Sequence, residues 1–185
     1  DVYRVRDYDS EQAEIFPHKL GGNHVFFLPY LMGERSPIND TNARACFIGI
    51  TLDSSRADLT QAVLEGVAFA IRDSLEVAKS LGLEISSSRL CGGGAKSPLW
   101  KRILANVLNL RLESPASEQG PGMGGAMLAM VACGIFPDVE TACRTLVHIS
   151  SAVEPETDLV EKYEKRYRQF KQIYPALKEL FPKLQ

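Results

Sequence analysis

Residues 89–100 have the sequence RLCGGGAKSPLW. This segment predicts the end of a buried strand, a bend of three consecutive glycines and the start of an amphipathic helix. Because the glycines have no side chains, a flat or anionic ligand can lie directly against the backbone of the bend. The helix that follows points unpaired N–H groups and the positive end of its dipole into the same space. The segment therefore predicts a nucleotide-binding site.

Two common nucleotide-binding motifs do not match the bend. A Walker A loop has Gly directly before Lys-Ser or Lys-Thr, but Ala95 precedes Lys96 here. The dinucleotide fingerprint G-x-G-x-x-G fails at its last position, because the run that starts at Gly92 ends in Ser97. Glu113 nevertheless lies on the next expected strand, where a dinucleotide-binding fold has its ribose-binding acid. Two alternatives stay open: an NAD-binding βαβ module, and a glycine turn that only lets helix and strand pack closely.

The composition is that of an ordinary globular protein, with 185 residues, 45% of them hydrophobic and 24% charged. A net charge of −2 without a basic cluster argues against nucleic acid or a membrane surface as partner. We recognise no signal peptide, lipidation motif or metal-binding spacing. The four cysteines have apolar neighbours, which predicts buried, reduced thiols and a cytoplasmic protein. They are at positions 46, 91, 133 and 143.

The hydrophobic pattern divides the chain into three parts. Residues 1–24 are a polar lead-in, residues 25–150 an α/β core, and residues 151–185 an amphipathic C-terminal helix that packs on the core. Strands are expected at 25–31, 45–51 and 111–114 and just before Cys91, and helices at 58–81, 97–108, 123–133, 139–147 and 158–180. The helix at 123–133 is apolar enough to predict burial. The strands are few for a complete sheet, so we expect further strands upstream and interpret the chain as part of a larger protein.

Several residues outside the bend are also candidates for a role. Gly66 interrupts a long helix, at a cost of about 1 kcal/mol in helix stability, so something is expected to approach its backbone closely. The preceding Glu65 is interpreted as a carboxylate on the face of that helix, with a side chain that faces the nucleotide as the alternative. Glu34 and Arg35 lie on a loop, either as cleft contacts or as parts of an ion pair that fixes the loop, with Asp40 as a partner.

Five further segments occur in an ordered arrangement that resembles one enzyme family. They are FLPYL (27–31) with GERSP (33–37), NAR (42–44), ACFIGI (45–50) and DLTQAVLE (58–65). Together with the glycine bend they resemble the FGGY family of carbohydrate kinases. The segment QGPGMGGA (119–126) resembles the branch of that family that phosphorylates D-xylulose. Kinases for gluconate, ribulose or glycerol remain alternatives within the family.

The resemblance implies a fold, a reaction and a set of partners. The implied fold is an α/β, actin-like and ribonuclease H-like ATPase domain of the hexokinase–actin superfamily, here only its C-terminal half without the first strands. The implied reaction is transfer of phosphate from ATP, with Mg²⁺, to a sugar. The catalytic Asp and most sugar contacts belong to an N-terminal domain of the same polypeptide, so the chain alone is expected to be inactive. A homodimer is a further expectation.

The resemblance also implies which residues bind the adenosine of ATP. They are Gly92, Gly93, Gly94, Ala95, Lys96 and Pro98. Gly93 and Gly94 would lie against the adenine and ribose, whereas Lys96 is either near the α-phosphate or a solvated cation. Pro98 fits the first turn of a helix, and Ser97 is expected to be its N-cap. Trp100 is either a core residue or a stacking partner of adenine, and a non-catalytic actin-like module that binds nucleotide remains a further alternative.

Overall fold

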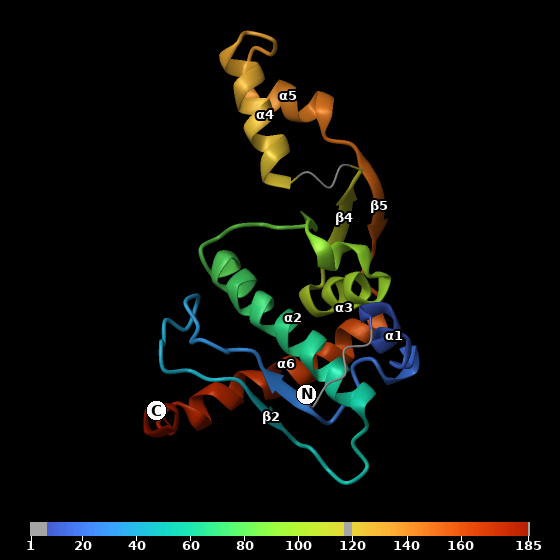
Figure 1. The fold of residues 1–185 in the computed structure, drawn as a ribbon, viewed down its shortest axis with the longest axis vertical. Coiled ribbons are helices and arrows are strands. Elements are labelled where there is room, and N and C mark those ends of the chain that lie inside the picture. The colour runs from blue at the N-terminus through green and yellow to red at the C-terminus, as the bar shows by residue number, and fades with distance from the viewer. Residues whose placement is uncertain (1–6, 117–119, 185) are drawn as a thin grey trace.

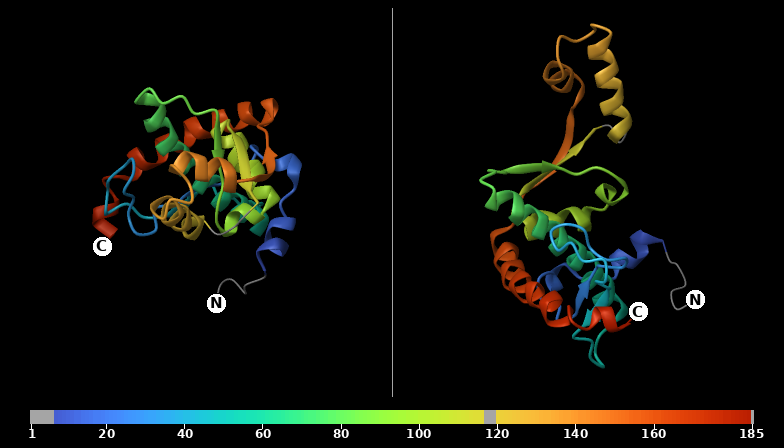
Figure 2. Two further views of the ribbon diagram at one scale, coloured as in Figure 1. Left: turned by 90° about the horizontal axis from the view of Figure 1, so that it is seen from above. Right: turned by 90° about the vertical axis from the view of Figure 1, so that its left-hand side faces the viewer.

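The computed structural model describes residues 7–116 and 120–184. It has a body built around three long helices, and a projection that consists of α4 (Gly120–Ala132) and α5 (Val139–Leu146) (Figure 1). The right-hand view of Figure 2 also shows that the projection stands away from the body and joins it through β4 and β5. No helix among the described residues is both long and apolar enough to cross a membrane.

The three long helices of the body are α2 (Arg56–Ser80), α3 (Pro98–Leu108) and α6 (Thr157–Leu177). Ser55 and Asp58 form a capping box at the start of α2, in which each side chain accepts a hydrogen bond from the other residue's backbone N–H. Asn109 ends α3 in the left-handed conformation, with φ 49°. The sequence predicted these helices, and α4 and α5, to within three residues at each end.

The described strands form two small sheets. β1 (Phe26–Leu28) and β2 (Cys46–Ile48) are antiparallel. β3 (Ser87–Arg89), β4 (Arg111–Pro115) and β5 (Ile149–Val153) form the second sheet in the order β3-β4-β5, with β3 parallel and β5 antiparallel to β4. β5 was not predicted, because its stability comes from pairing with β4 and its own residues are mostly exposed. The strand before Cys91 was expected to be buried, but β3 is exposed and lies at the edge of its sheet.

The short elements link these parts. Helix α1 (Tyr8–Ala13) and the 3₁₀ turn η1 (Pro17–Lys19) precede β1, the turn η2 (Gly93–Lys96) joins β3 to α3, and η3 (Phe181–Leu184) follows α6. Asp7 is the N-cap of α1, since its side chain accepts a hydrogen bond from the backbone N–H of Ser10. Helix α1 packs against α2, and a hydrogen bond from Ser97 to Gln12 joins it to the start of α3.

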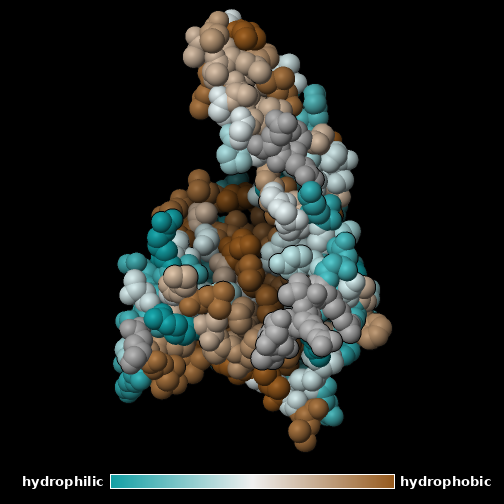
Figure 3. Space-filling view, in the orientation of Figure 1, coloured by the Kyte–Doolittle hydropathy of each residue, from teal (hydrophilic) through white to brown (hydrophobic). Residues whose placement is uncertain are grey.

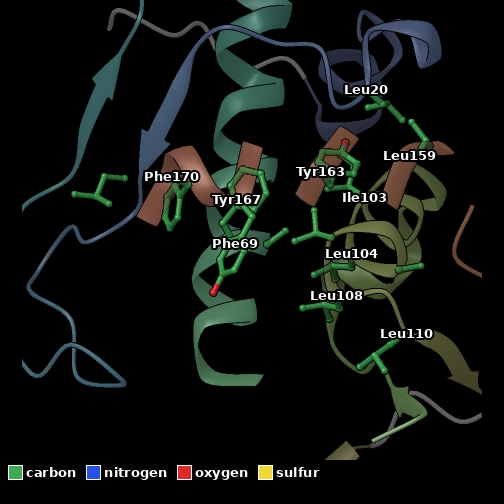
Figure 4. Packing of buried hydrophobic residues seen from close by; sticks show 14 of the residues in the cluster. Leu20, Phe69, Ile103, Leu104, Leu108, Leu110, Leu159, Tyr163, Tyr167 and Phe170 are labelled. Atoms are coloured by element: carbon green, nitrogen blue, oxygen red, sulfur yellow. The ribbon is translucent and has the colours of Figure 1, made fainter. Parts of the chain in front are cut away.

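The hydrophobic core lies where α2, α3 and α6 meet. Phe69 from α2 contacts Tyr163, Tyr167 and Phe170 from α6, with ring centroids 5.2–6.2 Å apart (Figure 4). The buried face of α3, labelled in Figure 4 at Ile103 and Leu104, completes this cluster. Burial of aromatic side chains is a large hydrophobic contribution, so the C-terminal helix is an integral part of the core.

Glu65 does not lie on an exposed helix face. Its side chain is fully buried, and Oε2 is 3.0 Å from Nη2 of Arg166 on α6. The other oxygen, Oε1, accepts hydrogen bonds from Gln61 and Tyr163. The helical pattern failed here because it shows the position of a residue on its own helix, and not the charge that a distant segment brings to it.

Gly66 has the close neighbour that the sequence predicted. A Cβ added to Gly66 would lie 2.1 Å from the carbonyl oxygen of Phe27. Real Cβ atoms do not approach an oxygen so closely, so only glycine allows β1 to lie directly on α2. The close packing of this strand and helix therefore depends on that residue.

Two expectations of burial are wrong. Of the residues of α4, only Met127 is buried, and Leu128 is 60% exposed. The helix projects from the body, and α5 is the main described element that packs against it. Cys91 and Cys133 are exposed, and the other two cysteines are only partly buried. The apolar sequence of α4 therefore forms a surface in this structure.

The loop of residues 33–44 is closed mainly by its backbone. Glu34 and Asp40 exchange two backbone hydrogen bonds, of 2.9 and 2.8 Å. The Asp40 carboxylate also accepts a hydrogen bond of 2.7 Å from Tyr174 of α6. The described residues give Arg35 no ion-pair partner, so the interpretation of an ion pair with Asp40 is not supported.

Candidate functional site

The glycine bend lies at the carboxyl end of β3, which runs parallel to β4. Ligands of open α/β sheets bind outside the carboxyl ends of parallel strands, so the bend has the position expected of a binding site. Gly92 has φ 91°, a left-handed conformation that favours glycine. The next four residues form η2, which turns the chain into α3.

The start of α3 is fixed by two residues whose roles the sequence predicted. Ser97 is the N-cap, and its Oγ accepts a hydrogen bond of 3.0 Å from the backbone N–H of Trp100. Pro98 occupies the first turn, where a missing N–H does no harm. The Ser97 hydroxyl also donates a hydrogen bond to Oε1 of Gln12 on α1. Helix α1 is thereby joined directly to the end of the bend.

A cavity of about 680 Å³ lies between the bend and α1. We call it the α1 cavity. On one side its lining includes Gly93, Gly94, Lys96 and the Trp100 side chain. The opposite wall consists of α1 residues, including Gln12, and Leu64 of α2. An indole, a leucine and bare backbone form a surface suited to a flat, largely apolar ring.

The α1 cavity also has charged groups at its edge. Lys96 contributes a cation from the bend, and Asp7 and Asp9 contribute carboxylates from α1. Hydrogen bonds from the backbone N–H and the hydroxyl of Ser10 lower the pKa of the Asp7 carboxyl. Asp7 is therefore ionised at neutral pH. A ligand with one anionic end would be drawn toward Lys96 and away from these carboxylates.

The three glycines of the bend have different surroundings. A Cβ at Gly94 would lie 3.0 Å from Nε1 of Trp100, so the space beside Gly94 is already occupied by the indole. A Cβ at Gly92 or Gly93 would have no neighbour within 4 Å. Gly92 has open space beside it but a left-handed backbone that a larger residue would rarely adopt. Gly93 has open space and no such backbone, so a side chain is best introduced there.

The remaining predicted residues lie mainly on the other side of the bend. Gly92, Ala95 and Lys96 line a smaller cavity of about 230 Å³ between the bend and β4–β5. Lys96 is thus the predicted residue that lines both cavities, and Pro98 lines neither of them. The bend separates two hollows, and the structure brings Gly93, Gly94 and Lys96 together in the larger one.

The residues of α1 were missed by sequence reasoning. Residues 1–24 have no motif that distinguishes Gln12 or Asp9, and α1 is only six residues long. Their position beside the bend depends on packing between segments that are far apart in the sequence. No local pattern contains that information, so the signal for them is in the tertiary structure alone.

A third hollow of about 380 Å³ lies between the end of β4 and the α4–α5 projection. Gly120 and Gly124 of α4 line it, together with Met123, Met127 and the exposed Cys91. Gln119, the first residue of the QGPGMGGA segment, lies outside the described residues. The lining is mostly apolar, and the described residues place no unpaired buried charge there.

Glu113 has neighbours that do not suit a ribose-binding acid. Its carboxylate lies 3.3 Å from Nε of Arg111 and 3.9 Å from Nε of Arg89. Glu113 lines none of the three hollows described above. The NAD-binding alternative therefore lacks the residue on which it depended.

The described part of the chain has no preformed cluster of ligands for the Mg²⁺ expected to accompany ATP. Among residues 7–116 and 120–184, no three His, Cys, Asp or Glu side chains lie close enough together to hold a metal ion. Mg²⁺ prefers carboxylates and phosphate oxygens as ligands. We therefore assign no Mg²⁺ ligand to the described residues.

The comparison with family models decides the family. The model of the FGGY family of carbohydrate kinases, C-terminal domain, matches residues 7–133. The chain belongs to the FGGY family of carbohydrate kinases. The matched range contains α1, the glycine bend and α4, so both walls of the α1 cavity lie within the FGGY domain.

Individual FGGY kinases show the same relationship. A xylulose kinase from Staphylococcus epidermidis is 35% identical over 162 residues, which are 88% of this chain and 33% of that protein. The crystal structure of a xyloylose kinase from Brucella ovis superposes with a TM-score of 0.85 at 39% identity, over 93% of this chain and 35% of that one. A gluconate kinase from Lactobacillus acidophilus also gives 0.85, at 25% identity, over 97% of this chain and 36% of that one.

These matches confirm the predicted fold, an actin-like α/β domain of the FGGY type. The chain spans about a third of the length of the curated relatives that it matches. The similarity thus covers the C-terminal domain of these kinases.

Proposed function

We propose that the chain is the adenosine-binding part of a cytoplasmic kinase that transfers phosphate from ATP to D-xylulose, forming D-xylulose 5-phosphate. The observation that supports this most directly is the α1 cavity beside the glycine bend, at the start of α3, in a chain of the FGGY family. In the same proposal residues 25–150 form the core of the adenosine-binding side. Residues 1–24 lead into it and contribute the α1 wall of the cavity, and the helix within residues 151–185 packs into the hydrophobic core.

Four of the six predicted residues have a physical role in this proposal. Gly93 lets the ring system lie on bare backbone, and Trp100 supplies an aromatic wall. Lys96 is placed to attract the phosphates. Gly92 gives the bend its left-handed turn, and Ala95 lines the smaller cavity on the other side of the bend.

Catalysis of phosphoryl transfer is mostly positioning and charge stabilisation. In the proposed enzyme, this chain binds and orients the adenosine end of ATP. We propose that an N-terminal domain supplies the catalytic Asp, the sugar site and the environment of Mg²⁺. The metal would neutralise charge on the phosphates when bound.

An exposed hydrophobic face supports the presence of such a partner domain. Beneath the α4–α5 projection the molecule is hollowed and largely hydrophobic over α2 (Figure 3). Ile71 and Val77 of α2 are each 42% exposed, Leu81 just after α2 is 76% exposed, and Leu128 of α4 is 60% exposed. Exposed apolar surface of this kind is typical of an interface with another domain. We propose that the N-terminal domain covers it.

A gluconate kinase is the second candidate. The structure of the Lactobacillus acidophilus gluconate kinase superposes as closely as that of the Brucella ovis enzyme. The α1 cavity would serve either enzyme, since both would use the same nucleotide. The higher identity to xylulose kinases favours D-xylulose.

The test is ATP-dependent phosphorylation by the full gene product, measured with D-xylulose, L-ribulose, gluconate and glycerol. A strong preference for D-xylulose supports the proposal, and a preference for gluconate supports the second candidate. Transfer to none of the four sugars, with ATP still bound, would overturn both in favour of a nucleotide-binding module without catalysis.

A further inference from the structure

The Ser97 hydroxyl takes part in two hydrogen bonds at the junction of the bend and α3. Its Oγ accepts from the Trp100 backbone N–H and donates to Oε1 of Gln12. A serine hydroxyl has one proton and several rotamers. With Gln12 present, one rotamer satisfies both neighbours.

Gln12 is held in place by the attachment of α1 to the body. The neighbouring Glu11 forms two hydrogen bonds with the Arg56 guanidinium at the start of α2. Ile15, just after α1, is buried in the core with 5% exposure. Since both attachments are independent of Ser97, α1 presents the Gln12 carbonyl to the bend from a fixed wall.

The contact joins the two walls of the α1 cavity. Gln12 lines the cavity on the α1 side, and Ser97 lines it on the other. Gly94 and Trp100 lie three residues on either side of Ser97, and a Cβ added at Gly94 would lie 3.0 Å from Nε1 of the indole. A shift of Ser97 would therefore move both the indole and the bare backbone that face the ligand.

We propose that Gln12 is a positioning residue of the nucleotide site: by fixing the Ser97 hydroxyl, it sets the geometry of the glycine bend and Trp100 and thereby the affinity for adenosine. This inference rests on the proposed function, and it adds a residue that neither the glycine motif nor the FGGY segments contain. Gln12 acts through Ser97 and takes no part in the chemical step.

The first experiment compares Gln12→Leu with wild-type full gene product. Leucine has a similar size but cannot accept the Ser97 hydrogen bond. Affinity is measured by displacing fluorescent mant-ADP with adenosine, which has no phosphate. We expect the dissociation constant for adenosine to rise about fivefold, the effect of one lost hydrogen bond. The Michaelis constant for ATP should rise similarly, while kcat and the melting temperature stay near wild type.

The matched control is Gln169→Leu, the same change at an exposed position of α6. It should leave the affinity for adenosine unchanged. Gln12→Glu is the conservative variant, since a carboxylate also accepts a hydrogen bond from Ser97. Gln12→Glu should bind uncharged adenosine almost as tightly as the wild type. If the Gln12 amide instead acted as a hydrogen-bond donor, Gln12→Glu would bind adenosine as weakly as Gln12→Leu does.

A double-mutant cycle shows whether Gln12 acts through Ser97. Ser97→Ala should itself weaken adenosine binding, because the N-cap of α3 is lost. Gln12→Leu should then have no further effect. A full fivefold loss in the Ser97→Ala background, or no loss in the wild-type background, overturns the inference. If wild-type protein binds neither mant-ADP nor adenosine, the proposed function has failed instead.

Discussion

The Glu65 carboxylate and the Arg166 guanidinium form an ion pair inside the core, with 3.0 Å between Oε2 and Nη2. Glu65 has no exposed surface and Arg166 only 6%. Arg166 also donates a hydrogen bond to the carbonyl oxygen of Val25, and its guanidinium lies over the Phe26 ring. The pair therefore joins α2 and α6 to the start of β1. Loss of solvation raises the pKa of Glu65 and lowers that of Arg166, against the attraction between them.

Removing one partner of this pair should be far more harmful than removing both. Glu65→Leu leaves the Arg166 charge buried and unpaired, and we expect unfolding free energy to fall by about 3–5 kcal/mol. The double variant Glu65→Leu/Arg166→Met should recover at least half of that loss. Urea denaturation measures both values. A double variant as unstable as the sum of the two single variants would contradict this account.

Gly66→Ala should destabilise the protein although alanine favours helices. The added Cβ would lie 2.1 Å from the Phe27 carbonyl oxygen, so β1 or α2 must shift. This shift should lower the free energy of unfolding by about 1–3 kcal/mol. Gly125→Ala in α4 is the matched control, because its Cβ would meet nothing within 4 Å. There the change should raise stability by about 0.5–1 kcal/mol. Thermal unfolding distinguishes the two, and equal effects would refute the close approach.

Asp58 should make stability depend on pH in the acidic range. Its carboxylate accepts hydrogen bonds from the Ser55 hydroxyl and backbone N–H and from Lys19, which together lower the pKa of Asp58 below 3.8. A lowered pKa in the folded state gives stability that is present above the unfolded value and is lost as the pH falls through the folded value. Asp58→Asn should therefore lower stability at pH 7 and flatten its decline below about pH 4. An unchanged acid profile would show that Asp58 makes no such contribution.

How far the sequence predicts the structure depends on the range of the interactions. The helices α2, α3 and α6 follow from hydrophobic periodicity and from caps such as Ser97, which are local features. Strand β5 and the pairing of Glu65 with Arg166 depend on segments far apart in the chain, and the sequence pattern missed both. The exposure of α4 was missed for a related reason, because an apolar helix indicates burial without indicating what covers it.

The candidate site shows the same division. The glycine bend could be predicted because a turn, a bare backbone and a helix start lie within a dozen residues. The opposite wall, with Gln12 and Leu64, could not, because it is formed by α1 and α2. The sequence also could not show that Gly94 faces the Trp100 indole, which makes its neighbour Gly93 the better probe of the ligand.

Gly93→Val should weaken nucleotide binding with little change in stability. Its side chain would extend into open space beside the α1 cavity, where the proposed adenosine lies, and Gly93 is not in the left-handed conformation. We expect the affinity for ATP to fall about tenfold or more, because a branched side chain would displace the ring from the backbone.

Gly94→Val should instead displace the Trp100 indole and lower the melting temperature. Trp100 is the one tryptophan of the sequence, so its fluorescence can be followed in this chain. Gly93→Val should weaken the change in fluorescence on addition of ATP, whereas Gly94→Val should shift the fluorescence of the protein without ATP. The Michaelis constant for ATP of the full gene product is the second measurement. A Gly93→Val enzyme with the wild-type constant would place the adenosine elsewhere than the α1 cavity.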